Sequence, residues 1–204
     1  MTLADRMVSR LVLGAVPPVT LMLAGWWGSL GVAGDGPWIA WSAFAGLALG
    51  VVLDATLLRR WVVSLFGLPT PALLGVALFY SVGVYGMFMG MPVANLLVGL
   101  VGGFVVGRRA ALRGEAADKA SGERRGVCVA ASALMAALCC ATAWLALSDP
   151  YTAGDLRGML GLGFTPSSAQ MWLLAVIGGV TLVGVEYVLT RASALWAASL
   201  RSAA

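Results

Sequence analysis

Residues 169–190 read AQMWLLAVIGGVTLVGVEYVLT and contain a single charged residue, Glu186. A helix rises about 1.5 Å per residue, so about 20 apolar residues cross the hydrocarbon core of a membrane, which is about 30 Å thick. The stretch is apolar throughout and lacks the alternation of apolar and polar residues that a membrane β-barrel strand requires. It therefore predicts a transmembrane helix.

Further stretches along the chain share this character. The predicted spans lie near 11–31, 38–58, 72–89, 91–108, 126–147 and 169–190. The composition agrees, because 60% of the residues are hydrophobic and 11% are charged, whereas a water-soluble domain carries about 25% charged residues. We expect residues 1–204 to form one membrane domain, an all-α, polytopic helix bundle with six transmembrane helices.

Basic residues lie almost entirely on one side of these spans. Of the 13 Lys and Arg residues, only Arg157 falls on the opposite side. Basic loops stay in the cytoplasm, so the asymmetry predicts cytoplasmic N and C termini in a cell membrane of the bacterial inner-membrane type. Residues 109–125 are then a cytoplasmic loop, solvated or helical and frayed, that joins two halves of three spans. Residues 148–168 are then an external loop.

The net charge of +4 is explained by this topology, so we expect anionic lipid at the cytoplasmic face of the bilayer, and not nucleic acid, as the basic surface's partner. The chain has no histidine, and Cys128, Cys139 and Cys140 form neither a C-x-x-C pair nor a zinc spacing. We therefore expect no cofactor and no metal centre built on these residue types. The cysteines are interpreted as small packing residues, with a redox role for the adjacent pair as the alternative.

Glycines recur at four-residue spacing in three of the predicted spans. The pairs and triplet are Gly46 and Gly50, Gly86 and Gly90, and Gly99, Gly103 and Gly107. This spacing lets helix backbones approach closely in lipid. The faces predict packing inside the bundle, with a homo-oligomer or a membrane-protein partner as the alternative.

Two carboxylates inside the predicted spans are the main candidate site. Asp54 precedes Arg59 by five residues, and Glu186 precedes Arg191 by five, which places both about 7–8 Å inside the cytoplasmic boundary. Ionisable groups at such depth are rare and often functional. The pair could carry a proton or hold a cation. In the alternative, each side chain extends to the inner interface and meets an arginine.

Uncharged polar residues extend this hypothesis. Asn95, Tyr85 and Tyr80 lie in the third and fourth spans and could contact a ligand, although an interhelical hydrogen bond is the simpler use of Asn95. Pro17 and Pro18 should kink the first span and free carbonyl groups.

The segments outside the spans also carry local signals. Residues 61–71 are too short to cross the membrane and predict an interfacial helix, or a re-entrant piece that lines a cavity. Asp155 can cap a short helix in the external loop, which could cover a site or only plug the bundle. Ser167 and Gln170 fit a capping box that opens the sixth span.

These observations favour two function classes. The first is a small solute- or ion-binding transport protein, or the membrane-embedded substrate-binding subunit of a transporter. The second is a non-catalytic structural or assembly subunit of a membrane complex. No nucleotide-binding P-loop is present, so the chain does not power transport by ATP hydrolysis in that manner. An enzyme is the least favoured class, because the chain has no histidine and few exposed nucleophiles.

Overall fold

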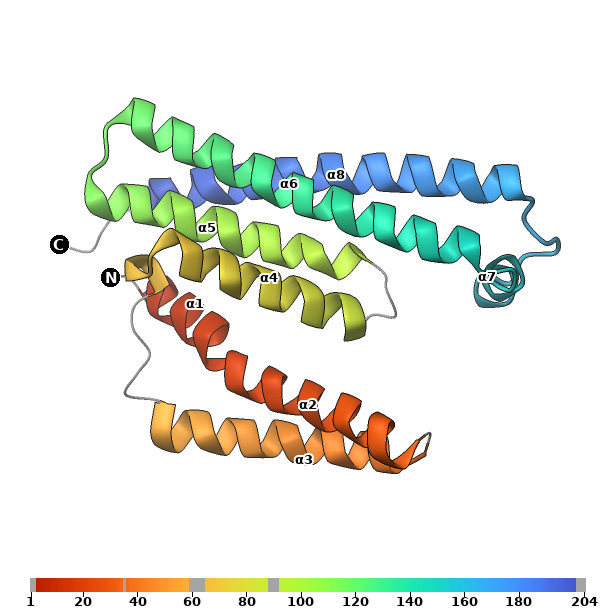
Figure 1. Cartoon of the computed structure of the whole chain (residues 1–204). Helices are drawn as coiled ribbons and strands as arrows, with labels where there is room; N and C mark the ends of the chain where they lie inside the picture. The colour runs from red at the N-terminus through yellow and green to blue at the C-terminus, as the bar shows by residue number, and fades with distance from the viewer. Residues whose placement is uncertain (1–2, 35, 59–64, 88–91, 201–204) are drawn as a thin grey trace. The chain divides into compact units, whose positions relative to one another are not determined.

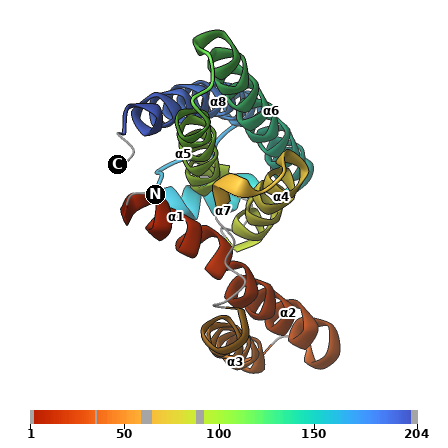
Figure 2. The same ribbon diagram turned by 90° about the vertical axis from the view of Figure 1, so that its left-hand side faces the viewer.

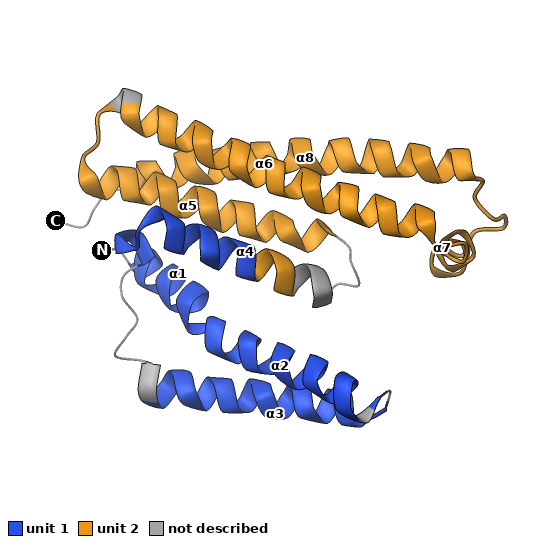
Figure 3. Ribbon diagram, in the orientation of Figure 1, with its two compact units in different colours: residues 1–79, 201–204 blue, residues 80–200 orange. Residues whose placement is uncertain are grey.

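The computed structural model describes residues 3–34, 36–58, 65–87 and 92–200, and every element in these ranges is a helix (Figure 1). The chain divides into two compact units, residues 1–79 with 201–204 and residues 80–200 (Figure 3). The predicted all-α class is therefore confirmed for the described residues.

Unit 1 begins with a broken helix. The two pieces are α1 (Leu3–Gly14) and α2 (Val16–Ala33), and the break falls just before Pro17 and Pro18, as predicted. Proline lacks an N–H group and its ring clashes with the preceding turn, so a continuous helix is disfavoured at this point.

The rest of unit 1 folds back on this helix. The helix α3 (Trp38–Leu53) packs along α2 and continues into a π-helical segment, Asp54–Leu58. A 3₁₀ turn follows at Leu65–Gly67, and α4 (Thr70–Met87) begins in this unit. Only the 65–71 part of the predicted interfacial segment is described.

Unit 2 contains the remainder of α4 and four further α-helices. These are α5 (Leu96–Arg113), which follows a 3₁₀ turn at Pro92–Asn95, α6 (Ala117–Ser148), α7 (Thr152–Leu160) and α8 (Ser168–Ser199). The helices α5, α6 and α8 contact one another, with the most extensive contact between α5 and α8 (Figure 2). The two run parallel, whereas α6 is antiparallel to both (Figure 1).

Five helices within the described ranges are long and apolar enough to cross a membrane. They are Leu3–Val32, Trp38–Thr56, Pro92–Arg113, Lys119–Ser148 and Ser168–Ser199. The apolar part of α4 found by the same criteria, Thr70–Gly83, is shorter. The helices are thus consistent with a multi-pass membrane protein, but six spans are not confirmed.

The outer surface of α8 has the character that lipid requires. Its large apolar side chains Trp172, Leu173, Val176, Ile177 and Val180 are all exposed. An apolar patch of this size on a water-soluble monomer would promote aggregation. In a bilayer the same side chains face hydrocarbon.

Charge is also segregated within unit 2. The C-terminal ends of α5 and α8 lie with the N-terminal end of α6 at one end of the helices (Figure 1). Every Lys and Arg of this unit except Arg157, in α7 at the opposite end, belongs to these helix ends. The segregation agrees with the predicted orientation, while the side of the membrane stays a prediction.

The segment 109–125, predicted as a cytoplasmic loop that is either solvated or helical and frayed, is mostly helical. The helix α5 continues to Arg113 and α6 begins at Ala117, so only a short connection remains. Gly114 supplies its positive φ of 59°, which glycine adopts without steric cost. Hydropathy indicates which part of a helix can lie in lipid. It does not indicate where the helix ends, because the same helix can continue through charged residues.

The segment 148–168 contains the predicted short helix, although α7 begins at Thr152 and places Asp155 inside its first turn. The capping box at the start of α8 is confirmed. Gln170 N donates to Ser167 Oγ at 3.4 Å, and Ser167 N donates to Gln170 Oε1 at 2.8 Å.

Candidate functional site

The two predicted carboxylates lie in different units. Asp54 opens the π-helical segment of unit 1, and Glu186 lies within α8 of unit 2. Each carboxylate therefore has its own surroundings. Their action as a pair stays a prediction.

Glu186 is held in the close contact between α5 and α8. Its side chain is 2% exposed and lies directly over Gly99 of α5, at the position that a Cβ atom on Gly99 would occupy. Its Oε2 atom has no hydrogen-bond partner within the described residues. Gly99 therefore leaves the space that the carboxylate fills.

This arrangement corrects the alternative in which Glu186 reaches the interface beside Arg191. Residues five positions apart point about 140° apart around a helix. Arg191 is exposed, whereas Glu186 is buried. The carboxylate consequently faces α5, and the arginine faces outward.

The glycine face of α5 explains how α8 comes so close. Gly103 lies against the backbone carbonyl of Thr190, and Gly107 against that of Ala194. Ser193 Oγ adds a hydrogen bond of 2.7 Å to the carbonyl of Leu100 across the same contact. Packing inside the bundle, predicted for this face, is confirmed.

Thr190 adds a second oxygen beside Glu186. A Cβ atom on Gly99 would lie 2.6 Å from Thr190 Oγ1. The Thr190 side chain is fully buried, and Oγ1 has no hydrogen-bond partner in the described part of the chain. The residue was not predicted, although its spacing of four from Glu186 places both on one helix face.

Asn95 lies one helical turn before Gly99. Its side chain is 3% exposed, and Oδ1 has no hydrogen-bond partner among the residues described. The simple interhelical bond expected of this amide oxygen is therefore not formed there. Asn95 contributes a buried acceptor one helical turn away from the level of the carboxylate.

Ser132 of α6 lies level with Glu186, as the helix register shows. Gly179 of α8 lies against Cys139 of α6, and the helices are antiparallel. Seven residues onward in α8 is Glu186, and seven backward in α6 is Ser132, the same rise along each axis. Ser132 Oγ is also buried without a hydrogen-bond partner in the described ranges. We call Glu186, Thr190, Asn95 and Ser132, which lie within about one helical turn of Glu186 along the helix axes, the Glu186 cluster.

The tyrosines contribute less to this site. Tyr80, in the unit 2 part of α4, is half-buried. Its side chain is not free, because the residue already interacts with another group of the protein. The Tyr85 side chain lies outside the described residues. The next residue after Tyr80, Ser81, is buried, and its Oγ atom lacks a hydrogen-bond partner within the described chain.

Asp54 has a different environment, against the break between α1 and α2. A Cβ atom on Gly14 would lie 3.2 Å from Asp54 Oδ2. The side chain is half-buried, and it forms no hydrogen bond or ion pair with the residues that the structure describes.

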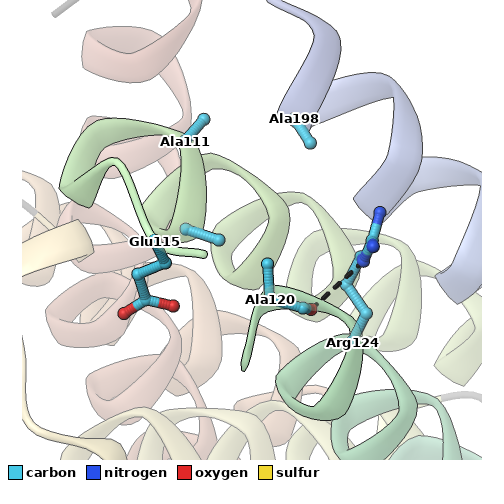
Figure 4. Close-up of a pocket in the computed structure, with 6 residues that line it drawn as sticks. Ala111, Glu115, Ala120, Arg124 and Ala198 are labelled. Atoms are coloured by element: carbon cyan, nitrogen blue, oxygen red, sulfur yellow. Dashed lines mark hydrogen bonds between the residues drawn. The ribbon is translucent and has the colours of Figure 1, made fainter. Parts of the chain in front are cut away.

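A pocket of about 160 Å³ lies at the basic end of unit 2 (Figure 4). Four alanines line it together with Glu115 and Arg124. Glu115 Oε1 lies 3.5 Å from both Arg113 Nη1 and Lys119 Nζ, and Arg124 Nε donates to the Ala120 carbonyl at 3.1 Å. Glu115 Oε2 is buried without a hydrogen-bond partner in the described ranges. Two cationic side chains nevertheless lie close to Oε1 of the same carboxylate, so the negative charge of Glu115 is compensated, and the Glu186 cluster is the stronger candidate site.

The cluster's donor set is restricted to oxygen. No group of three or more His, Cys, Asp or Glu side chains that could hold a metal occurs among the described residues. One carboxylate with hydroxyl and amide oxygens suits a hard cation of low charge. No protein-family model, curated protein or solved structure matches this chain.

Proposed function

We propose that this chain is an ion-binding membrane protein of the transport class, and that unit 2 holds a small monovalent cation at the Glu186 cluster. The Glu186 carboxylate carries this proposal. It is 2% exposed, and Oε2 has no hydrogen-bond partner among the described residues. An uncompensated buried charge costs several kcal/mol, roughly, so a positive ion at this position would relieve a large penalty.

Two further oxygens within about one helical turn of Glu186 support a cation over an organic solute. Thr190 Oγ1 and Asn95 Oδ1 are also buried and without a hydrogen-bond partner in the described ranges. Acceptors without donors are stabilised by a positive charge. The close approach of Gly99 to Glu186 favours an ion over a metabolite, because a metabolite would have to separate the two helices.

The glycine faces are one of the features that suit the assembly alternative. Gly46 and Gly50 are packed against α2 within unit 1, and Gly99, Gly103 and Gly107 are packed against α8 within unit 2. Gly86 and Gly90 fall outside the residues with described side chains. A partner subunit would therefore have to dock away from these two packed faces.

Cation-dependent stability of the purified full chain tests the proposal. Unfolding is followed by heating in sodium, lithium or potassium chloride, with choline chloride at equal ionic strength as the reference. A ligand at 100 times its Kd adds about 2.7 kcal/mol, so one of the small cations should raise the unfolding temperature. Glu186→Gln, which keeps the shape of the side chain, should abolish that rise. Equal unfolding temperatures in all four salts would contradict the proposal.

The membrane orientation is proposed with it. We place both chain termini and the 109–125 segment on the cytoplasmic side of a cell membrane. Single cysteines at Ser121 and Thr152, in a chain whose three native cysteines are replaced by serine, should react from opposite sides with a membrane-impermeant thiol reagent. Labelling of both from one side would refute this orientation.

A further inference from the structure

Unit 1 contains a second acidic side chain, Asp54, packed against the backbone of another helix. The backbone near it includes two prolines, which have no N–H group to donate. Gly46, Gly50 and Asp54 follow one another at four-residue spacing and share a helix face. Gly46 lies against Leu21, Gly50 against Pro18, and Asp54 against Gly14. The close packing of α3 on α2 thus directs the Asp54 carboxylate at the helix break.

The break supplies oxygens that lack their helical donors. In a continuous helix, the N–H groups of residues 17 and 18 would donate to the carbonyls of Leu13 and Gly14. Both residues are prolines and have no N–H group. The carbonyls at the end of α1 therefore lose these two intrahelical bonds.

The same prolines leave the carboxylate with few donors. An anion beside a helix N-terminus is normally stabilised by free N–H groups of the first turn. In α2, two of those groups are absent, and the N–H of Val19 donates to the Ala15 carbonyl at 3.0 Å. The N–H of Ala15 donates to the Leu11 carbonyl at 3.3 Å. Asp54 forms no ion pair or hydrogen bond with the described residues.

We propose that the α1–α2 break is a second cation site, in which Asp54 and the carbonyls of Leu13 and Gly14 bind a sodium ion. A carboxylate and backbone carbonyls are hard oxygen ligands, and interrupted helices in membranes coordinate monovalent cations in this way. The site belongs to unit 1 and is independent of Glu186. One negative charge matches one monovalent ion, and the membrane surroundings disfavour further uncompensated charge.

Equilibrium binding of radioactive sodium to the detergent-purified full chain tests the site separately from the Glu186 cluster. If both sites bind sodium, the wild type takes up two ions, and Asp54→Asn and Glu186→Gln each take up one. If unit 2 prefers another cation, the wild type takes up one sodium ion and Asp54→Asn takes up none. Sodium uptake by Asp54→Asn equal to that of the wild type overturns the inference, whatever Glu186→Gln shows.

A second variant keeps Asp54 and alters only the carbonyl acceptors. Pro18→Ala restores an N–H group that can donate to the Gly14 carbonyl, and it retains the Cα atom that contacts Gly50. This hydrogen bond competes with the ion, so sodium affinity at the site should fall by about tenfold. Pro37→Ala, at the start of α3, is the matched control and should bind as the wild type does. An unchanged affinity in Pro18→Ala overturns the role assigned to the break.

Discussion

Both units pack two helices closely through glycines, but the relative directions of the two helices differ. The exposure of the acidic side chain differs as well. In unit 1, α2 and α3 are antiparallel, and the carboxylate of Asp54 follows two glycines on the same helix. In unit 2, α5 and α8 are parallel, and the carboxylate of Glu186 lies on the helix opposite the glycines (Figure 1). Asp54 is half-buried, whereas Glu186 is 2% exposed.

The difference shows what glycine does in each contact. At Gly99 it makes room for an entire carboxylate, so burial of the charge is a direct consequence of a missing side chain. At Gly14 the Asp54 carboxylate lies against the end of α1 and remains only half-buried. The unit 2 site should therefore respond more strongly to changes in charge and volume.

Enlarging the glycine face of α5 should produce the largest loss of stability. In Gly103→Ala the new Cβ atom would meet the Thr190 backbone, which cannot move without separating α8. Overpacking of this kind costs about 1–3 kcal/mol, measured as a lower free energy of unfolding in detergent. Gly102→Ala is the control, since its nearest contact, Val127, would lie at 3.7 Å. Equal losses of unfolding free energy in the two variants would show that the close contact of Gly103 with α8 is not the cause.

The equivalent change in unit 1 tests whether the antiparallel pair is as tight. Gly50→Ala would bring a Cβ atom onto the Pro18 backbone, so we expect a loss near the lower end of the same range, about 1–2 kcal/mol. Gly28→Ala, with open space around the Cβ position, should have little effect. A larger loss in Gly50→Ala than in Gly103→Ala would reverse the comparison between the units.

Neutralising Glu186 should change stability in opposite directions with and without the cation. Without a small cation, Glu186→Gln removes a buried charge and should raise the free energy of unfolding by about 1 kcal/mol. In saturating cation the variant should be less stable than the wild type, because it gains no binding energy. Unfolding is measured in choline and in the active salt. A variant that is less stable in both would indicate a purely structural carboxylate.

Removing the α8 cap should have the smallest effect. Ser167→Ala deletes the oxygen that accepts from Gln170 N, and loss of an N-cap costs about 1 kcal/mol or less at an exposed position. Thermal unfolding should fall slightly, and cation binding at Glu186 should be unchanged. A large change in binding would mean that the N-terminal end of α8 is coupled to the cluster.

The sequence predicted best what depends on local chemistry. Apolar length identified α8, the Ser167–Gln170 pair identified its start, and Pro17 with Pro18 identified the break in the first helix. Each of these follows from a few consecutive residues. The chain's glycine spacing also identified the close face of α5, because periodicity defines a helix face before any partner is known.

What could not be predicted depends on which helices become neighbours. Asp54 and Glu186 were paired by depth alone, and depth says nothing about the partner helix. Thr190 was treated as the end of a span, because hydropathy does not reveal that α8 continues to Ser199. Ser132 has no signal in its own segment, and only the register of α6 against α8 brings it level with Glu186.

The parallel contact between α5 and α8 makes the number of residues in α8 as important as their identity. Glu186, Thr190 and Ala194 meet Gly99, Gly103 and Gly107 in phase. Deleting one residue between 186 and 194 would rotate the carboxylate by about 100° relative to the segment after it. Substitutions on the lipid-facing side of α8 should therefore be tolerated, whereas insertions and deletions between residues 186 and 194 should not.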